Sequence, residues 1–117
     1  MKCYYAHCMA LYNTPQEARD IALLESLGFE VLNPNAPEHE HNWETLGMDY
    51  AHALVTQCEV FAFRALPESG NIPSGVYTEI RIAQSLDIPV IELPSCIGYR
   101  EMSYPMTVEY LKEVGQR

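Results

Sequence analysis

The sequence predicts a single-domain, three-layer α/β/α fold with a four- to five-stranded parallel sheet of the flavodoxin or Rossmann-like type. Short apolar stretches alternate with segments of helical periodicity along the 117 residues. This alternation is typical of parallel strands joined by right-handed helical crossovers and covered by helices on both faces. Because a chain of this length usually forms one hydrophobic core, we expect one domain over residues 1–117. The simplest strand order is 2-1-3-4.

The individual elements follow from apolar runs and from residues that start or stop helices. Apolar and aromatic residues predict four strands, over residues 2–7, 29–32, 60–64 and 89–93. A capping box at Thr14–Glu17 predicts the start of the first helix, and Gly28 suits its C-terminal end. Ser74 is expected to cap the third helix. The later helices are predicted over residues 44–57, 74–86 and 106–114.

Composition restricts the classes of partner and the cellular location. The net charge is −9 with only seven basic residues, which argues against binding to DNA or RNA polymers. No apolar run approaches the ~20 residues needed to cross a bilayer, so no membrane partner is expected. The N-terminus leads directly into a strand and lacks a signal-peptide pattern, which predicts a cytoplasmic protein. The four cysteines show no CxxC spacing and are expected to be reduced, structural thiols.

A ligand site is expected at the carboxyl edge of the predicted sheet. In open doubly wound sheets, ligands bind beyond the carboxyl ends of the strands, near the point where the strand order reverses. Three segments that are longer or more polar than a minimal connection meet there: residues 7–13, residues 64–75, and the chain from Pro94 onward. His7 directly follows the first strand, so it is either a pocket residue or a structural histidine.

The helix that begins at Ser74 carries the sharpest local feature. Free N–H groups at its N-terminus attract an anion, and Gly75 allows a ligand to approach the backbone closely. Glu79 lies on a helical stripe with Ile82 and Leu86, so its carboxylate must be paired, hydrogen-bonded or functional. Alternatively, Glu79 only favours the N-terminal turn of the helix electrostatically and reaches water.

Several short motifs together suggest a known family. They are YYAH at residues 4–7, the proline-rich end of the second strand, and SGVYTE at residues 74–79 followed by Ala83 and by PVI at residues 89–91. In these motifs the chain resembles the nucleoside 2-deoxyribosyltransferase-like superfamily, which includes deoxyribosyltransferases and deoxynucleotide N-glycosidases. The resemblance extends from the first strand through the fourth.

The resemblance implies a role for each matching residue. Glu79 takes the position of the family's nucleophile, which attacks the anomeric carbon of a (deoxy)ribosyl unit as the base departs. Tyr5 and His7 correspond to positions that line the sugar pocket. Ser74 and Gly75 match the segment that contacts the 5′ side of the sugar or a 5′-phosphate. The family also builds sites across subunit contacts, which implies a homodimer or a higher homo-oligomer.

One departure from the family pattern affects the expected activity. Family members usually place an aspartate near the end of the third strand to help protonate the leaving base. Here no carboxylate follows that strand until Glu68, and Arg64 at the strand end better suits an anionic ligand. We therefore expect an N-glycosyl hydrolase or transferase acting on a (deoxy)nucleoside or nucleotide. The alternative is a non-catalytic nucleotide-binding or sensing module of the same fold.

A few further residues are candidates for binding a ligand or a metal. No cofactor and no metal are expected: residues 38–41 (EHEH) lack the spacing of zinc motifs, and the loop that carries them is solvated or acts as a lid. Trp43 either anchors that loop to the core or stacks on a nucleobase. Tyr77 and Tyr99 are further candidates for the pocket, and Arg100 is a second candidate for binding an anion.

Overall fold

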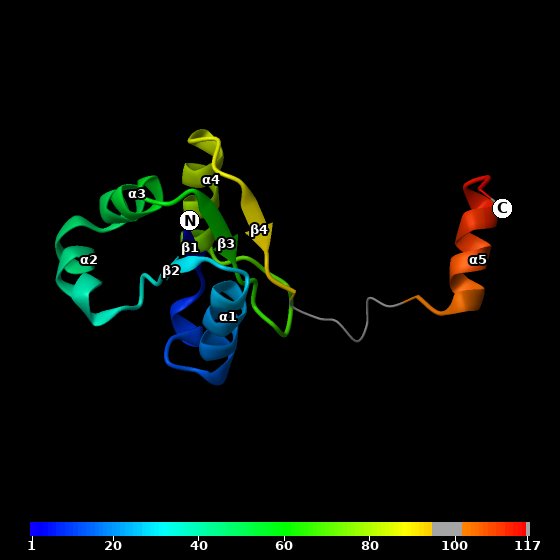
Figure 1. Ribbon diagram of the computed structural model, residues 1–117, viewed down its shortest axis with the longest axis horizontal. Helices are drawn as coiled ribbons and strands as arrows, with labels where there is room; N and C mark the ends of the chain where they lie inside the picture. Colours follow the sequence, from blue (N-terminus) through cyan, green and yellow to red (C-terminus); the bar gives the residue numbers. More distant parts are fainter. Residues whose placement is uncertain (95–101, 117) are drawn as a thin grey trace.

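The core of the protein is a four-stranded parallel sheet with the strand order β2-β1-β3-β4 (Figure 1). We describe residues 1–94 and 102–116 of the chain in a computed structural model. The strands are β1 (Lys2–Ala6), β2 (Glu30–Leu32), β3 (Val60–Phe63) and β4 (Val90–Glu92). The predicted α/β class and the predicted strand order are both confirmed. Among the described residues no fifth strand is present.

The two central strands are buried on both faces of the sheet. Tyr4 of β1 pairs with Phe61 of β3, and Tyr5 pairs with Ala62 in the next register position. Because successive side chains of a strand point to opposite faces, Tyr4 and Tyr5 enter different cores. Tyr4 and Phe61 belong to one buried cluster, whereas Tyr5 and Ala62 belong to the other. Every one of these four residues is fully buried.

Helices cover the two faces unequally. One face packs against α1 (Pro15–Ser26), whose Leu24 belongs to the same core cluster as Tyr5. The other face packs against α3 (Met48–Thr56) and α4 (Ser74–Ser85), whose apolar residues surround Tyr4. The short helix α2 (Glu40–Leu46) precedes α3 and lies to the side of the sheet (Figure 1). The layers therefore have the predicted α/β/α arrangement.

The helix starts agree only in part with the predicted capping. The Thr14 hydroxyl accepts a hydrogen bond from the Glu17 N–H at 3.4 Å, as a capping box requires. The Glu17 side chain, however, accepts from the N–H of Asn13 and not from that of Thr14. The N-cap of α4 is Pro73, and Ser74 lies within the first turn without a side-chain cap. The prediction that Ser74 caps this helix is therefore wrong by one residue.

The predicted helix over residues 44–57 is two helices. The first, α2, begins at Glu40, after a 3-10 turn over Pro37–His39 that interrupts the predicted loop. The break lies at Gly47, whose φ of 55° is a conformation that residues with a Cβ rarely adopt. Glycine separates the two helices here because the chain must change direction between α2 and α3.

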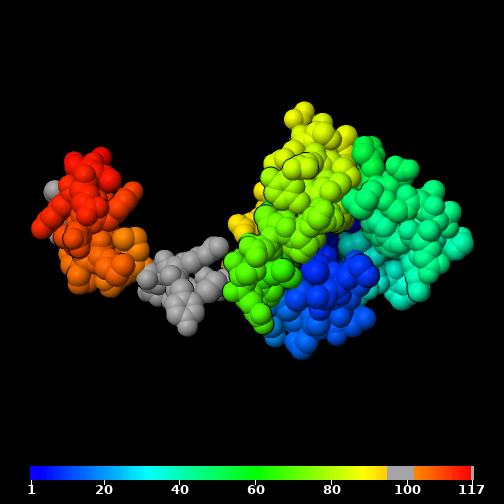
Figure 2. All heavy atoms as spheres, turned by 180° about the vertical axis from the view of Figure 1, so that it is seen from behind, coloured from blue at the N-terminus to red at the C-terminus, as the bar shows by residue number. Residues whose placement is uncertain are grey.

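The C-terminal helix α5 (Tyr104–Glu113) is capped by the Ser103 hydroxyl, which accepts from the Met106 N–H. It begins two residues before the predicted segment and lies apart from the sheet (Figures 1 and 2). Over the described parts of the chain, no helix combines the length and apolar character that crossing a membrane requires.

Three cysteines are free thiols, as expected: Cys3, Cys8 and Cys58. Cys3 and Cys58 are buried. Burial raises the pKa of each of these two thiols to about 11, so both behave as small apolar side chains. The remaining candidates Cys96, Tyr99 and Arg100 lie outside the described residues.

Candidate functional site

A cavity of about 920 Å³ lies at the carboxyl edge of the sheet, where a site was predicted. It is bounded by residues 7–13 after β1, by residues 33–37 after β2, by α2 and by the first turns of α4. In Figure 2 these segments surround a hollow between the N-terminal segment, the α2–α3 region and α4. The volume falls within the range of cavities that enclose small organic ligands.

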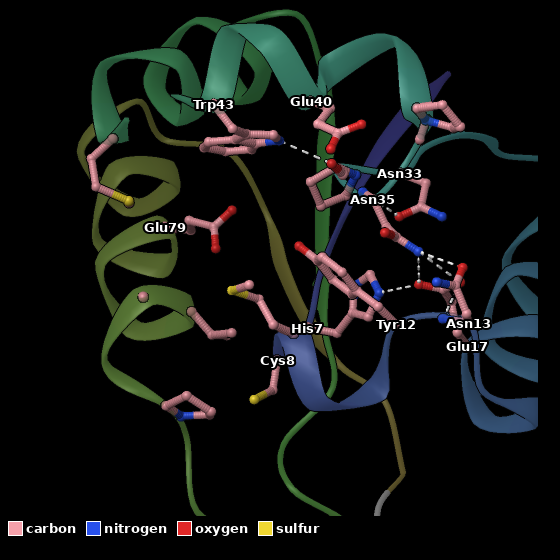
Figure 3. A pocket seen from close by; sticks show the side chains of 18 of the residues that line it. His7, Cys8, Tyr12, Asn13, Glu17, Asn33, Asn35, Glu40, Trp43 and Glu79 are labelled. Atoms are coloured by element: carbon pink, nitrogen blue, oxygen red, sulfur yellow. Dashed lines mark hydrogen bonds and ion pairs between the residues drawn. The ribbon is translucent and has the colours of Figure 1, made fainter. Parts of the chain in front are cut away.

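Glu79 forms part of the α4 wall of this cavity. Its side chain is 8% exposed, and Oε2 accepts a hydrogen bond from the hydroxyl of Tyr4. No described residue donates to Oε1, and that oxygen is not sealed off from the cavity. Figure 3 shows the carboxyl group facing the open space between α4 and the segment after β1. The alternative in which Glu79 merely reaches open water does not fit this geometry.

Burial governs the electrostatics of Glu79. It raises the pKa of the carboxyl group from 4.5 to about 7, because the charged form loses hydration; the hydrogen bond from Tyr4 acts in the opposite direction. Burial also raises the pKa of Tyr4 well above its usual range, and the nearby Glu79 carboxylate adds to this effect. Tyr4 therefore stays a neutral donor while Glu79 changes charge near neutral pH.

The opposite wall is a hydrogen-bonded set of polar side chains. His7 Nε2 lies 2.6 Å from Glu17 Oε2, and its Nδ1 lies 3.2 Å from the carbonyl oxygen of Tyr5. Asn35, from the loop after β2, donates through Nδ2 to both carboxylate oxygens of Glu17 at 3.0 and 3.2 Å. Tyr12 contacts the His7 ring at 4.9 Å between centroids. His7 is thus both a fully bonded residue and a lining residue (Figure 3).

The upper wall in Figure 3 comes from α2. Trp43 donates from Nε1 to the carbonyl oxygen of Pro34 at 2.9 Å and meets the Tyr50 ring edge-on at 5.1 Å. It therefore anchors the loop and also lines the cavity, so both roles considered for it are compatible with the structure. Glu40 and Glu44 line the same wall, and neither forms an ion pair with a described residue.

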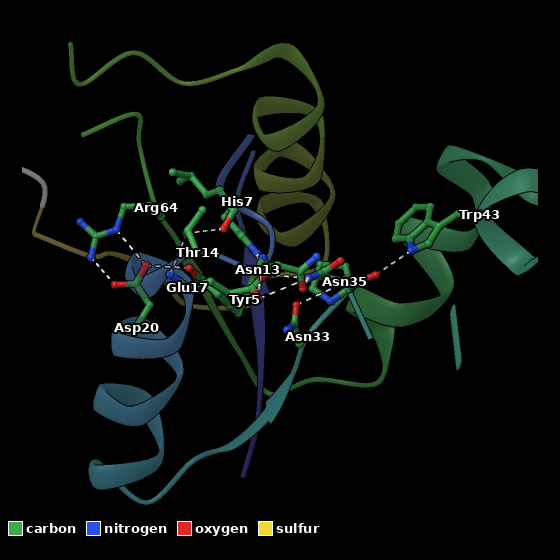
Figure 4. A network of polar contacts seen from close by, with 12 residues as sticks. Tyr5, His7, Asn13, Thr14, Glu17, Asp20, Asn33, Asn35, Trp43 and Arg64 are labelled. Atoms are coloured by element: carbon green, nitrogen blue, oxygen red, sulfur yellow. Dashed lines mark hydrogen bonds and ion pairs between the residues drawn. The ribbon is translucent and has the colours of Figure 1, made fainter. Parts of the chain in front are cut away.

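Two predicted site residues point to the other face of the sheet. The Tyr5 hydroxyl donates to Asp20 Oδ2 at 2.6 Å, and Arg64 donates to both Asp20 oxygens, at 2.5 and 3.0 Å (Figure 4). Arg64 also donates to the carbonyl oxygens of Leu93 and Pro94. Neither Tyr5 nor Arg64 lines the cavity. The expectation that Arg64 binds an anionic ligand does not fit the structure, because its guanidinium is buried against Asp20.

This arrangement stabilises the ionised form of Asp20. Burial alone would raise the pKa of its carboxyl group, but hydrogen bonds from Arg64, Tyr5 and Gln16 hold that pKa below its usual value. The three hydrogen-bonded partners come from β1, α1 and the end of β3, and Arg64 also holds the chain after β4. The network therefore joins β1, α1, the end of β3 and the chain after β4, and its role is structural.

Of the other predicted site residues, some line the cavity and others do not. Gly75 lines the cavity together with His7 and Glu79. Ser74 is exposed and outside the lining. Tyr77 is 44% exposed, the Arg81 guanidinium lies 4.4 Å from the centre of its ring, and Tyr77 does not line the cavity. Three of the seven predicted site residues thus line the cavity, and Tyr5, Arg64, Ser74 and Tyr77 do not. The Tyr5 ring nevertheless stacks on the ring of His7, with 4.0 Å between centroids.

Four of the polar residues that shape the site have no predicted ligand role from the sequence: Tyr4, Tyr12, Glu17 and Asn35. For Tyr4 a signal existed, because strand alternation places Tyr4 and Tyr5 on opposite faces and only one of them can meet Glu79. For Glu17 the sequence predicts only a capping role. Its contact with His7 depends on how α1 packs beside β1, which local patterns do not encode.

Comparison with models of known protein families gave no match, and searches of curated proteins and of solved structures found no similar protein. The geometry itself presents a definite chemical arrangement. A buried carboxyl group whose pKa is raised to about 7 faces a cavity of ligand size, with one oxygen held by Tyr4 and the other open. Such a group can act as a nucleophile or as a general base.

Proposed function

We propose that the protein is an N-glycosyl hydrolase or transferase that acts on a (deoxy)nucleoside or nucleotide, with Glu79 as the nucleophile. The observation that carries this proposal is the placement of Glu79: nearly buried, held at one oxygen by Tyr4, and open to the cavity at the other. The sequence resemblance to the nucleoside 2-deoxyribosyltransferase-like superfamily, in which a glutamate early in this helix attacks the sugar, supports the same assignment.

The two Glu79 oxygens have separate roles in this reaction. Oε1 attacks the anomeric carbon while the bond from that carbon to the base breaks, which gives a glycosyl-enzyme ester. Tyr4 donates to Oε2 and fixes the carboxylate orientation, so the attacking oxygen is positioned before the substrate arrives. Water or a second base then attacks the same carbon and releases Glu79.

The rest of the cavity supports the binding of a nucleoside. Trp43 and Tyr12 offer aromatic faces to a base. Asn33 Nδ2 and Asn35 Oδ1 have no hydrogen-bond partner among the described residues, so they can bond to hydroxyls. Gly75 leaves the start of α4 without a side chain, and a Cβ there would meet no atom within 4 Å. A ligand can therefore approach the backbone of α4 next to Glu79.

One observation favours a second candidate, a non-catalytic module that binds or senses a nucleotide. The described segment between β3 and α4, residues 64–73, contributes no carboxylate to the cavity; Arg64, which directly follows β3, is paired with Asp20. An enzyme of this type that lacks a proton donor for the base would bind the nucleotide but would not cleave off its base. The two candidates therefore differ in turnover and not in ligand.

Base release decides between them. The purified protein is incubated with a panel of 2′-deoxynucleosides, ribonucleosides and their 5′-monophosphates, and free base is quantified by chromatography. We expect release by the wild-type protein, loss of at least about a hundredfold in Glu79→Ala, and a mass increase of one glycosyl unit on the wild-type protein after acid quench.

The control variant is Glu25→Ala, because Glu25 is an exposed glutamate of α1 away from the cavity. It should release base at the wild-type rate. Saturable binding by wild-type protein without any base release would favour the sensing module. Equal release by wild-type protein and by a folded Glu79→Ala variant would refute the assigned nucleophile.

A further inference from the structure

Acidic residues outnumber basic residues in the lining of the cavity. Among the described residues that line it are four glutamates and one histidine, with no lysine or arginine. His7 is paired with Glu17, which leaves Glu40, Glu44 and Glu79 without a cationic partner among the described residues. A cleft lined by carboxylates concentrates cations and repels anions.

Two arginines of the described part of the chain are held away from the cavity. Arg64 is buried against Asp20 on the other face of the sheet, and Arg81 lies over the exposed ring of Tyr77. The first turn of α4 offers N–H groups to an anion, but Glu79 follows on the same helix one turn later and its ionised form opposes an anion there. The cavity is therefore poorly suited to a phosphate group.

An aromatic surface accompanies the carboxylates. Trp43 is held in place by its hydrogen bond to Pro34 and by Tyr50, and it lines the cavity on the same short helix as Glu40 and Glu44. Indole is the aromatic side chain that binds cations most strongly through its face. A fixed indole beside unpaired carboxylates is a combination that recognises a planar organic cation.

We propose that the substrate of this site is an N-glycoside whose base carries a positive charge, such as an N-glycosyl pyridinium, on a sugar without a phosphate. This inference rests on the proposed function and narrows its substrate class. It also accounts for the missing acid after β3, because a cationic base needs no proton in order to leave.

The bond changes balance without a proton donor. As the C1′–N bond breaks, its electron pair returns to the ring nitrogen, so the pyridinium leaves as a neutral pyridine. Oε1 of Glu79 supplies the electron pair for the new C1′–O bond. Water then attacks C1′, the ester bond breaks to restore the carboxylate, and the proton of the water passes to solvent at the open side of the cavity.

The test compares two ligands of nearly equal size that differ in charge. Nicotinamide riboside is the cation, and its reduced 1,4-dihydro form is the neutral analogue. Binding is measured by calorimetry on the Glu79→Gln variant, which cannot turn the ligand over, and nicotinamide release is measured on the wild-type protein. We expect the cation to bind at least about tenfold more tightly, and nicotinamide mononucleotide to bind at least about tenfold more weakly than the riboside.

Removing one unpaired carboxylate tests whether these carboxylates cause the preference for the cationic ligand. Glu44→Gln should weaken binding of nicotinamide riboside about twofold to fivefold, because Glu44 is exposed and its interaction with the ligand is partly screened. Glu25→Gln, which removes the same charge from α1, should leave the affinity unchanged and serves as the matched control.

The outcomes separate this inference from the proposed function. Glu79-dependent base release from neutral nucleosides, with no preference for the cation, would overturn the inference and leave the proposed function standing. Tight binding of the cation without nicotinamide release by the wild-type protein would overturn the proposed function and leave only the charge selectivity. Preferential binding of the mononucleotide would overturn the inference directly.

Discussion

Replacing Glu79 by glutamine should make the protein more stable at alkaline pH. Burial raises the pKa of this carboxyl group from 4.5 to about 7 in the folded protein, so the folded state binds its proton more tightly than the unfolded chain does. The stability that this proton contributes is complete below pH 4.5 and is lost as pH rises through about 7. At about 1.4 kcal/mol per pKa unit, the loss is about 3 kcal/mol.

Urea unfolding at a series of pH values between 4 and 8.5 measures this effect directly. The difference in unfolding free energy between Glu79→Gln and the wild-type protein should grow by about 3 kcal/mol across that range in favour of the variant. Other titrating groups are common to both proteins and cancel in the difference. The exposed control Glu25→Gln should change by no more than a few tenths of a kcal/mol. A difference for Glu79→Gln that stays flat with pH would refute the buried environment described for this carboxylate.

Three further outcomes follow from the same contacts. In the wild-type protein, base release should increase as pH rises through about 7, because only ionised Glu79 attacks; an initial-rate profile from pH 5 to 9 that is flat would contradict this. Tyr4→Phe removes the donor that lowers the pKa of Glu79, so the midpoint of that profile should move to higher pH, and an unmoved midpoint would show that the hydrogen bond has no such effect. Asp20→Asn leaves Arg64 buried without its counter-ion and should lower the unfolding free energy by about 3–5 kcal/mol in urea titration. A loss below about 1 kcal/mol would mean that water hydrates the Arg64 guanidinium in the folded variant.

The fold followed from features that act locally. The alternation of short apolar strands with amphipathic segments predicted a parallel sheet, and the strand order agrees with the structure. The helix starting at the SGVYTE motif was placed correctly because helical spacing puts Glu79 beside apolar positions. The break at Gly47 was missed, since a single glycine inside a helical pattern does not reveal whether the chain bends there.

The site was harder to predict because its contacts join distant parts of the chain. Tyr4 and Tyr5 are adjacent and chemically alike, and only the placement of α4 on one face and α1 on the other decides which of them meets Glu79. Arg64 was expected at the ligand edge, but its partner Asp20 lies 44 residues away on α1. A charged residue at the end of a strand can turn to either face, and local sequence does not determine which.

The bend at Gly47 has a consequence for how the cavity is closed. If α2 continued straight into α3, Trp43 and the two carboxylates would lie on the surface of a single long helix that points in the direction of α3. The backbone angles at Gly47 turn α2 out of that axis and place Trp43, Glu40 and Glu44 along the cavity. A residue with no side chain of its own thus determines which side chains a ligand would meet.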